Sequence, residues 1–401
     1  MGITKIKGND CKKGRSIWEE VFSEDSKEFT EYYFEQKAKN NIGYILGKEP
    51  YEAMLYRTPY PIQIYREQKS LSYIVGVATR ESVRHQGKMT ALMKKALEDM
   101  YREKNPFTFL MPANPAIYEP FDFRYVYERP VWEFKDETFP LLVLEPLIGT
   151  KKIVKIELPQ EKTREHTGKE LKAAWTEAFH WSGIKNQVAE DNVQIEKQQR
   201  LLTIKSVSGS IEENTEINIY QKLADFANQW LAVHADIYVY RDASYYEMQI
   251  KESQAQNGDI FLMEEHGEIV GFFLYAREGD EIFVQEVMEQ EEGLFSFLQI
   301  QPQKKPIIMA RIVHLEEMLK LVRSSEHKTI LLEVKDKLIQ ENTGLYLWEI
   351  TPTGSLVSCI EKQSEDISLS GNDTTKDENI SIDIGELTPY LFGRVFINEI
   401  V

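Results

Sequence analysis

The most informative residues of the sequence lie at one turn, Arg84-His85-Gln86-Gly87-Lys88-Met89. The apolar run before it predicts a strand, and the helical spacing of the apolar residues after it predicts an amphipathic helix. The first turn of a helix has unpaired N–H groups and the positive end of the helix dipole, which suit a phosphate. Gly87 lets the backbone approach a ligand closely, and Arg84 and Lys88 add positive charge. The turn is therefore predicted to bind a pyrophosphate.

Two other phosphate-binding loops are excluded by the residues around Gly87. A Walker loop requires a glycine five residues earlier, where the sequence has Ser82, and a serine or threonine after the lysine, where it has Met89. A dinucleotide-binding fingerprint requires three spaced glycines, and this turn has one.

The turn resembles motif A of the GNAT acetyltransferases, which reads Gln or Arg, two residues, Gly, one residue, and Gly or Ala. Arg84 and Gly87 match this pattern, and Met89 departs from its last position. The segment from Ala113 to Phe123, with Tyr118 at its centre, is similar to one in the Eis-type (enhanced intracellular survival) N-acetyltransferases, a family that tolerates a larger residue at that position. Members of the family have a similar length, and the resemblance covers the whole chain.

The resemblance implies a mixed α+β fold in three parts. A GNAT domain with the acetyl-CoA site is expected at 1–135, a degenerate GNAT-like domain without a CoA site at 136–303, and a sterol carrier protein-like domain at 304–401. The second part echoes the order of elements of the first, but it has four carboxylates between Glu286 and Glu292 where the first has its basic turn. These carboxylates would repel a pyrophosphate, so we expect no CoA binding there.

Other elements are predicted from periodicity. Helices are expected over 14–40 with a break near 23–25, and over 168–180, 217–232, 294–300, 315–323 and 385–391; strands over 42–58, 60–66, 106–111, 124–134, 259–265, 268–276, 282–287, 307–313, 329–335, 345–350 and 354–359; a domain boundary at 304–306; and a mobile loop over 361–379.

The resemblance also implies the chemistry, which is acetyl transfer from acetyl-CoA to an amine. Main-chain groups of the strand before the turn would contact the pantetheine and thioester, N–H groups of the turn would bind the pyrophosphate, and the later loop would add further contacts. The cofactor-binding residues expected on this basis are Val77, Ala78, Thr79, Arg84, His85, Gln86, Gly87, Lys88, Met89, Thr90, Ala113 and Asn114.

Two groups are expected to move protons, again by resemblance. Tyr118 would protonate the leaving thiolate, and the main-chain carboxylate of Val401 would accept the proton of the attacking amine. An exposed α-carboxyl has a pKa of about 3.3–3.7 and is a poor base, but burial would raise that pKa. The tail over 393–401 is apolar enough to be buried. Glu399 is the alternative base.

Three aromatic residues near the N-terminus, Phe22, Tyr33 and Phe34, are candidates for the wall of the amine pocket. An ordinary helix core is the simpler interpretation of most of them. The histidines show no ligand spacing, so no metal site is predicted.

The charge distribution bears on the partners. Residues 1–135 hold 22 Lys and Arg against 19 Asp and Glu, a balance of +3, which leaves −20 for the rest of a chain with a net charge of −17. An acidic body disfavours nucleic acid and anionic lipid, and it agrees with a cationic acceptor such as an aminoglycoside, a polyamine or a lysine side chain. Apolar runs long enough for a membrane span or signal peptide are not found, and two distant cysteines favour a cytoplasmic protein.

Two other functions stay open at this point. One is a non-catalytic acyl-CoA or lipid-binding protein, and the other is an enzyme that modifies a protein partner. The family resemblance further implies a homo-oligomer, specifically a hexamer.

Overall fold

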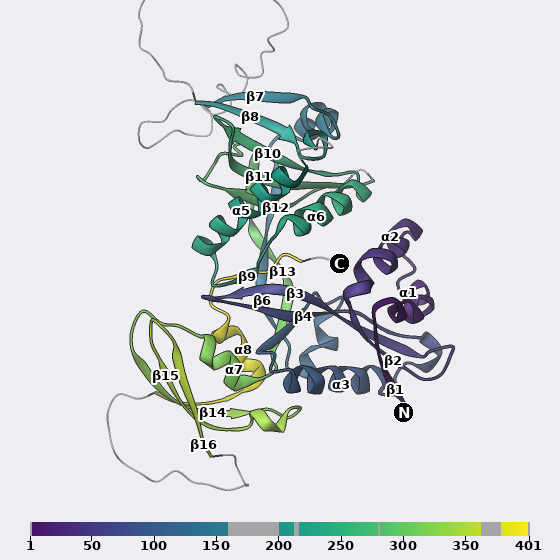
Figure 1. Ribbon diagram of the computed structural model, residues 1–401, viewed down its shortest axis with the longest axis vertical. Coiled ribbons are helices and arrows are strands. Elements are labelled where there is room, and N and C mark those ends of the chain that lie inside the picture. Colours follow the sequence, from purple (N-terminus) through teal and green to yellow (C-terminus); the bar gives the residue numbers. More distant parts are fainter. Residues whose placement is uncertain (1, 159–199, 212–215, 280, 362–377, 400–401) are drawn as a thin grey trace, which may run out of the picture. The chain divides into compact units, whose positions relative to one another are not determined.

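The computed structural model describes residues 2–158, 200–211, 216–279, 281–361 and 378–399 (Figure 1). The chain forms two compact units, each with helices and strands, which confirms the predicted mixed α/β class. The first unit comprises Met1–Pro130, Leu231–Tyr240 and Gln303–Val401, and the second comprises Val131–Trp230 and Arg241–Pro302. Among the described residues, no helix combines the length and apolar character that a membrane crossing needs.

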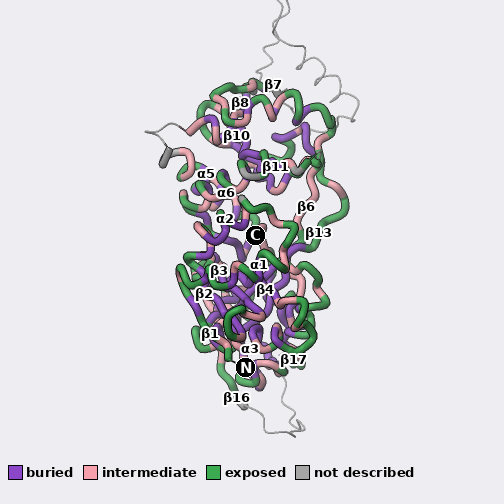
Figure 2. Tube along the Cα trace, turned by 90° about the vertical axis from the view of Figure 1, so that its right-hand side faces the viewer, coloured by how far each residue is buried: buried purple, intermediate pink, exposed green. Residues whose placement is uncertain are grey.

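The first unit contains a mostly antiparallel sheet. Its strands are β1 (Ile3–Lys7), β2 (Ile42–Leu46), β3 (Ala53–Ile64), β4 (Glu67–Thr79), β5 (Phe107–Leu110) and the second half of β13 (Leu298–Ile312), in the order β1-β2-β3-β4-β5-β13. Only β4 and β5 are parallel within this order, so their carboxyl ends point the same way. Buried residues gather along β3 and β4 (Figure 2). Ligands of α/β folds bind at such carboxyl ends.

Helix α3 (Lys88–Arg102) follows β4 and packs on this sheet. Its buried apolar residues are Leu92, Met93, Ala96, Leu97 and Met100, which confirms the predicted amphipathic helix. Each such Leu or Met contributes about 1.5–3 kcal/mol relative to an exposed position. The helix therefore holds its N-terminus, with the predicted turn, at a fixed place beside the sheet.

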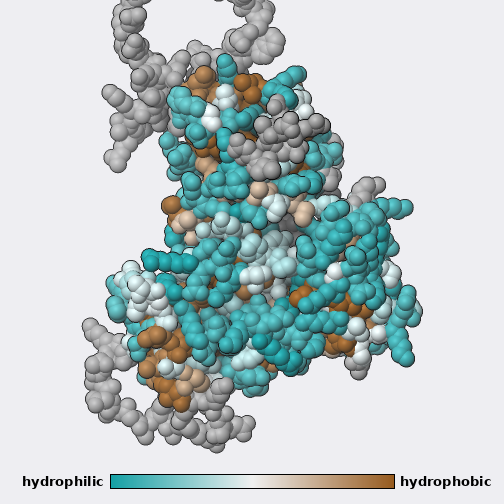
Figure 3. Space-filling view, in the orientation of Figure 1, coloured by the Kyte–Doolittle hydropathy of each residue, from teal (hydrophilic) through white to brown (hydrophobic). Residues whose placement is uncertain are grey.

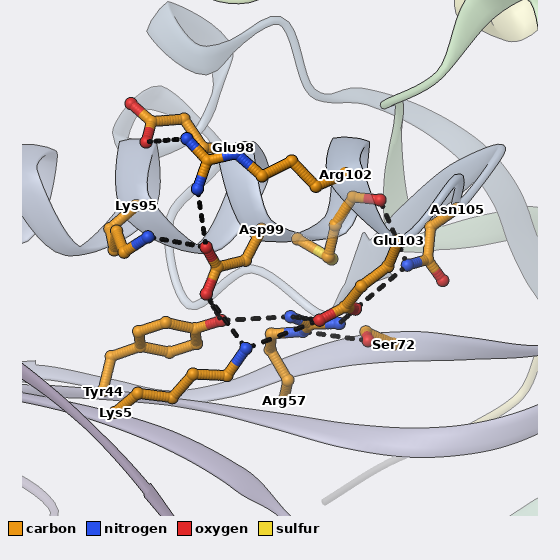
Figure 4. Close-up of polar contacts among 11 residues, drawn as sticks. Lys5, Tyr44, Arg57, Ser72, Lys95, Glu98, Asp99, Arg102, Glu103 and Asn105 are labelled. Atoms are coloured by element: carbon orange, nitrogen blue, oxygen red, sulfur yellow. Dashed lines mark hydrogen bonds and ion pairs between the residues drawn. The ribbon is translucent and has the colours of Figure 1, made fainter.

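A partly buried polar network reinforces the docking of α3 (Figure 4). Arg57 of β3 forms an ion pair with Glu103 and donates through Nη1 to the hydroxyl of Tyr44 (3.0 Å). That hydroxyl donates to Asp99 (3.0 Å), which also pairs with Lys5 of β1 (3.0 Å). Burial alone would raise the pKa of Asp99, but hydrogen bonds from neighbouring cations and Tyr44 lower it to about 2. The network thus joins the last turns of α3 to three strands.

Two short helices, α1 (Arg15–Val21) and α2 (Lys27–Tyr32), complete the N-terminal part and confirm the predicted break between them. After residue 303 the first unit contains α7 (Leu315–Leu321), α8 (Ile384–Leu391) and a second sheet of four strands. These strands are β14 (Lys328–Lys335), β15 (Gly344–Ile350), β16 (Ser355–Glu361) and β17 (Glu378–Asp383), in the order β16-β15-β14-β17. Apolar side chains reach the surface of this sheet (Figure 3), and Leu356 and Ile360 of β16 are exposed.

The C-terminal tail is built into the first unit. Strand β18 (Val395–Phe396) pairs in parallel with β9 (Ile237–Val239), which in turn pairs with β3. Ile397 and Glu399 are 0% and 3% exposed. The tail from Val395 to Glu399 is therefore buried or half-buried, whereas Gly393 and Arg394 are exposed. Val401 and most of the expected loop over 361–379 lie outside the described residues.

The second unit contains the strands β7 (Ile153–Leu158), β8 (Arg200–Ser206), β10 (Asp259–Glu265), β11 (Glu268–Glu278) and β12 (Glu281–Glu289), in the order β12-β11-β10-β8-β7, and the helices α5 (Glu216–His234) and α6 (Ala243–Ala255). Helix α5 continues into the first unit, and strand β6 (Arg124–Phe134) passes between the units. The strands predicted over 259–265 and 268–276 are confirmed, and they pair as a hairpin around His266-Gly267. The helix predicted over 168–180 lies outside the described residues.

One prediction in this region is wrong. Residues 294–300 form turns and the start of β13 instead of a helix. The expected boundary at 304–306 lies inside β13, close to the division between the two units at Pro302 and Gln303.

Candidate functional site

Strand β4 has a bulge just before its end. Met54 pairs with Ala78, but Tyr56 pairs with Val75, so Leu55 faces both Gly76 and Val77. Gly76 has a φ of +59°, and a Cβ there would lie 2.7 Å from the Trp18 ring, so glycine is required. A bulge twists a strand and redirects its backbone groups, and bulges are frequent beside active sites. A lone glycine inside an apolar strand pattern is the sequence signal that predicts such a bulge.

The turn between β4 and α3 is open and left-handed at two positions. His85 has a φ of +62° and Gly87 a φ of +72°, and residues 84–87 are exposed. A Cβ on Gly87 would meet nothing within 4 Å. The first helical hydrogen bond runs from the Ala91 N–H to the Gly87 carbonyl (3.0 Å). The N–H groups of residues 88–90 are thus left for an external acceptor, with no acidic residue in the first helical turn.

The two basic side chains of the turn behave differently. Arg84 is exposed and donates through Nε to the carbonyl of Thr79 (3.2 Å), which braces the turn. Lys88 is only 7% exposed, and its Nζ lies 2.7 Å from the Glu52 carboxylate. The expectation that the Lys88 side chain adds positive charge for a ligand is therefore wrong, because Glu52 already neutralises it. Its N–H group remains part of the helix N-terminus.

Met89, at the position that departs from motif A, packs partly buried against the core under α3. Its bulk is therefore directed into the protein instead of into the turn. Among the other predicted contacts, Val77 and Thr79 are half-buried and Ala78 is buried, while Gln86 and Thr90 are exposed. A cavity of about 770 Å³ also lies beside the start of the turn, lined by residues that include Gly47, Arg80 and Lys88.

Tyr118 lies on the loop that follows β5. Ala113 and Asn114 are exposed in this loop, and the Asn114 side chain accepts the N–H of Ala116 (3.0 Å), which starts a short 3-10 turn. Tyr118 is 8% exposed, and its ring packs edge-on against Phe123 at a centroid distance of 6.1 Å. Burial raises the pKa of Tyr118 to about 12. The phenol therefore keeps its proton at neutral pH.

Tyr73 is a functional candidate that the sequence analysis missed. It lies on β4, where it pairs with Phe109 of the parallel strand β5. Burial raises the pKa of the Tyr73 hydroxyl, the nearby Glu399 and Tyr118 add to the effect, and the backbone of Met111 opposes it. Tyr73, Tyr118 and Glu399 therefore belong to one electrostatic neighbourhood. No local pattern in the sequence indicates this, because the three residues come from distant parts of the chain.

The N-terminal aromatic residues form a core. Trp18 stacks on Tyr33 with centroids 4.3 Å apart and meets Phe34 edge-on at 5.7 Å. Tyr33 and Phe34 are 0% and 1% exposed, which argues against the prediction that they line an open amine pocket. Phe22 is half-buried beside Trp18 (4.8 Å) and stays a candidate. The described residues contain no group of three or more His, Cys, Asp or Glu suited to a metal ion.

Comparison with known proteins agrees with this geometry. Residues 3–126 match the model of the acetyltransferase (GNAT) domain. No curated protein matches the sequence. The fold is similar to that of a conserved protein of unknown function from Enterococcus faecalis, with a TM-score of 0.65, 15% identity and coverage of 98% of this chain and 90% of that one.

Two further solved structures are similar over nearly the whole chain. A GCN5-related N-acetyltransferase from Anabaena variabilis has a TM-score of 0.61 at 13% identity, covering 97% of this chain and 89% of that one. Eis1 from Mycobacterium abscessus has a TM-score of 0.59 at 9% identity, covering 98% and 90%. At such identities the similarity establishes the fold. With the domain match at residues 3–126, it shows that the chain carries a GNAT acetyltransferase domain and confirms the predicted enzyme class.

Proposed function

We propose that this protein is an acetyl-CoA-dependent N-acetyltransferase that transfers the acetyl group directly to the amine of a cationic acceptor. The observation that carries the proposal is the open turn at residues 84–87. It follows a bulged β4 and leaves the first N–H groups of α3 for an anion. The pyrophosphate of acetyl-CoA is an anion of the right kind for this position. The bound thioester supplies the acetyl group.

Tyr118 is the proposed proton donor to the thiolate that leaves. With a pKa of about 12 it is a weaker acid than a thiol of reference pKa about 8.5, so free proton transfer would be unfavourable. A phenol in a buried site nevertheless donates a strong hydrogen bond to charge that develops on sulfur. This role requires the thioester sulfur to lie within hydrogen-bond reach of the Tyr118 hydroxyl.

The proposed base is a carboxylate of the C-terminal tail. The pairing of β18 with β9 and the burial of Ile397 and Glu399 support this, since they attach this part of the tail to the first unit. Two carboxylates remain candidates, the main-chain group of Val401 and the side chain of Glu399. Adding one glycine after Val401 would move the main-chain carboxylate, and Glu399→Gln would remove the side-chain carboxylate. The variant that lowers kcat identifies the base.

The acidic balance of residues 136–401 supports a cationic acceptor such as a polyamine, an aminoglycoside or a lysine side chain. We also propose a cytoplasmic homo-oligomer, a hexamer if the Eis-type resemblance extends to assembly. The same resemblance is the support for a sterol carrier protein-like third domain and for the division at 135 and 303.

The test is the release of CoA thiol from acetyl-CoA with a panel of polyamines, aminoglycosides and a lysine-containing peptide. We expect release with at least one amine, and a 10²–10³-fold lower kcat in Tyr118→Phe with an unchanged KM for acetyl-CoA. Tyr125→Phe is the matched control, since Tyr125 is a half-buried tyrosine beside the same core, and it should retain kcat. Acetyl-CoA binding without release for any amine would indicate the non-catalytic binder instead.

A further inference from the structure

The loop that carries Tyr118 is fastened by one buried arginine from a distant part of the chain. Arg311 of β13 is 0% exposed, and its Nε donates to the carbonyl of Phe121 at 2.7 Å. Its Nη1 donates to the carbonyl of Ile312 (2.9 Å), and its Nη2 to the Asp336 carboxylate (2.7 Å). All these residues belong to the first unit. The guanidinium is thus held on three sides, and one of its partners is the Tyr118 loop.

Asp336 is itself fixed by the backbone around it. The N–H groups of Leu338 and Ile339 donate to its Oδ1 at 2.9 and 3.0 Å, and Asn342 donates to its Oδ2 at 2.9 Å. Asp336 is 2% exposed. A carboxylate with this many donors keeps its place, so the guanidinium opposite it cannot swing away without breaking a satisfied buried network.

The path from Arg311 to Tyr118 is short. The N–H of Phe121 donates to the carbonyl of Tyr118 (2.9 Å), so the residue that Arg311 holds is itself bonded to Tyr118. Asp122 closes the turn in a left-handed conformation with a φ of +64°. On the other side α8 leaves no room, because a Cβ on Gly385 would lie 3.1 Å from Asp122. The turn is therefore confined between β13 and α8.

We propose that Arg311, held by Asp336, is a positioning residue that sets the location of the Tyr118 hydroxyl. The inference rests on the proposed function, in which Tyr118 stabilises the leaving thiolate. A misplacement of about 1 Å can cost about 10²-fold in rate, so a group that fixes this turn controls kcat without touching substrate. In this proposal the chain after residue 303, through Arg311 and Asp336, also fixes the position of Tyr118, the proposed proton donor.

The test variant is Arg311→Met/Asp336→Asn, which removes the charge pair together so that neither charge is left buried alone. In it the Phe121 carbonyl loses its donor, while the asparagine can still accept the N–H groups of Leu338 and Ile339. We expect kcat to fall about 10–100-fold and the KM for acetyl-CoA to stay within about twofold. In the Tyr118→Phe background the same change should cost no more than about twofold, because its target is already absent.

The matched control is Arg241→Met/Glu286→Gln in the second unit. This pair is buried like that of Arg311 and Asp336, and it has two N–O contacts, of 2.6 and 2.7 Å, where the other has one. It should lower the thermal midpoint to a similar extent and retain kcat. Equal losses of kcat with and without the Tyr118 hydroxyl, or an unchanged kcat in the folded Arg311 variant, would overturn the inference.

The same assay separates this inference from the proposed function. No thiol release by the unmodified chain overturns the proposed function. An active chain in which Tyr118→Phe has no effect overturns the role of Tyr118, and the inference with it. An active chain that depends on Tyr118 but not on Arg311 overturns the inference alone.

Discussion

Each of the two units contains a bulged hairpin that is followed by a glycine with a positive φ, but the residues after the hairpins differ. In the first, β3 and β4 form a bulged hairpin that leads to a left-handed glycine, Gly87. In the second, β11 and β12 form a bulged hairpin with Gln285 as the extra residue, followed by Gly293 with a φ of +90°. The bulged hairpin is repeated, but the segments after it differ, since α3 follows Gly87 in the first unit and turns that lead into β13 follow Gly293 in the second.

The two units differ in what can bind the backbone N–H groups that follow the hairpin. In the first unit a 15-residue helix starts directly after the turn, and its N–H groups face outward. In the second unit the carboxylate of Glu289 accepts the N–H of Gly293 (3.1 Å) and of Phe295 (3.4 Å). In the second unit a carboxylate of the chain itself, that of Glu289, thus accepts the N–H groups of the loop. The second unit also lacks a helix N-terminus in the described segment between β12 and β13, and together these two features support the expectation that this unit does not bind CoA.

The largest effect is expected from Gly87→Asp. Aspartate tolerates a positive φ, so the turn should keep its shape while a negative charge enters it. We expect the affinity for acetyl-CoA to fall by about 100-fold, since charge repulsion of a few kcal/mol is typical at this range. Titration calorimetry would measure it.

Gly293→Asp and Gly87→Asn serve as controls. The first places the same charge at the equivalent glycine, and the second adds a similar side chain without charge. Both should bind acetyl-CoA within about fivefold of the unmodified chain. Equal losses in the two aspartate variants would mean that both turns contribute to binding, and the comparison would fail.

A smaller effect is expected from Asp99→Asn, which weakens the attachment of α3. The free energy of unfolding should fall by about 1–3 kcal/mol, because Lys5, Lys95 and Tyr44 lose a charged acceptor. The pKa of Asp99 is lowered to about 2, so its contribution is present above its unfolded pKa of about 3.9 and is lost as the pH falls toward 2. Chemical denaturation at pH 7 and pH 3 would measure both.

Glu98→Gln is the control for that experiment, since Glu98 is an exposed neighbour on the same helix. It should change stability by less than about 0.5 kcal/mol. If Asp99→Asn unfolds with the same profile as the unmodified chain at both pH values, the network of Figure 4 does not hold the helix.

The smallest effect is expected from Glu289→Gln. The amide oxygen of the new side chain can still accept the N–H groups of the loop, so the side chain at position 289 loses its charge but keeps its hydrogen bonds. We expect one acetyl-CoA per chain both before and after the change, with affinities within about twofold. Binding of a second acetyl-CoA in this variant would show that the charge of Glu289 alone prevents acetyl-CoA from binding to the second unit.

Local patterns were enough to predict the parts of the site that are local. The 3.6-residue spacing after Gly87 predicted α3, and the turn residues predicted an open helix N-terminus. Side-chain pairing across the fold was not predictable in this way. Glu52 neutralises Lys88 from the neighbouring hairpin, and Arg311 reaches Phe121 over a separation of 190 positions. Nothing in either local sequence specifies such a partner, because topology alone brings them together.

The same limit explains the aromatic residues. Tyr33 and Phe34 have the types expected of a pocket wall, but amphipathic spacing also describes a core, and burial decided for the core. Tyr73 was missed for the opposite reason, since an aromatic residue in an apolar strand has no visible signal of function. Its neighbours Tyr118 and Glu399 become apparent only in the folded chain.

Amide hydrogen exchange of the full chain, with and without acetyl-CoA, tests the central claim most directly. The account predicts that acetyl-CoA slows exchange over residues 85–91, whose N–H groups begin α3, and leaves residues 289–295 unchanged because Glu289 already holds that loop. Protection over 289–295, or none over 85–91 at saturating acetyl-CoA, would contradict it.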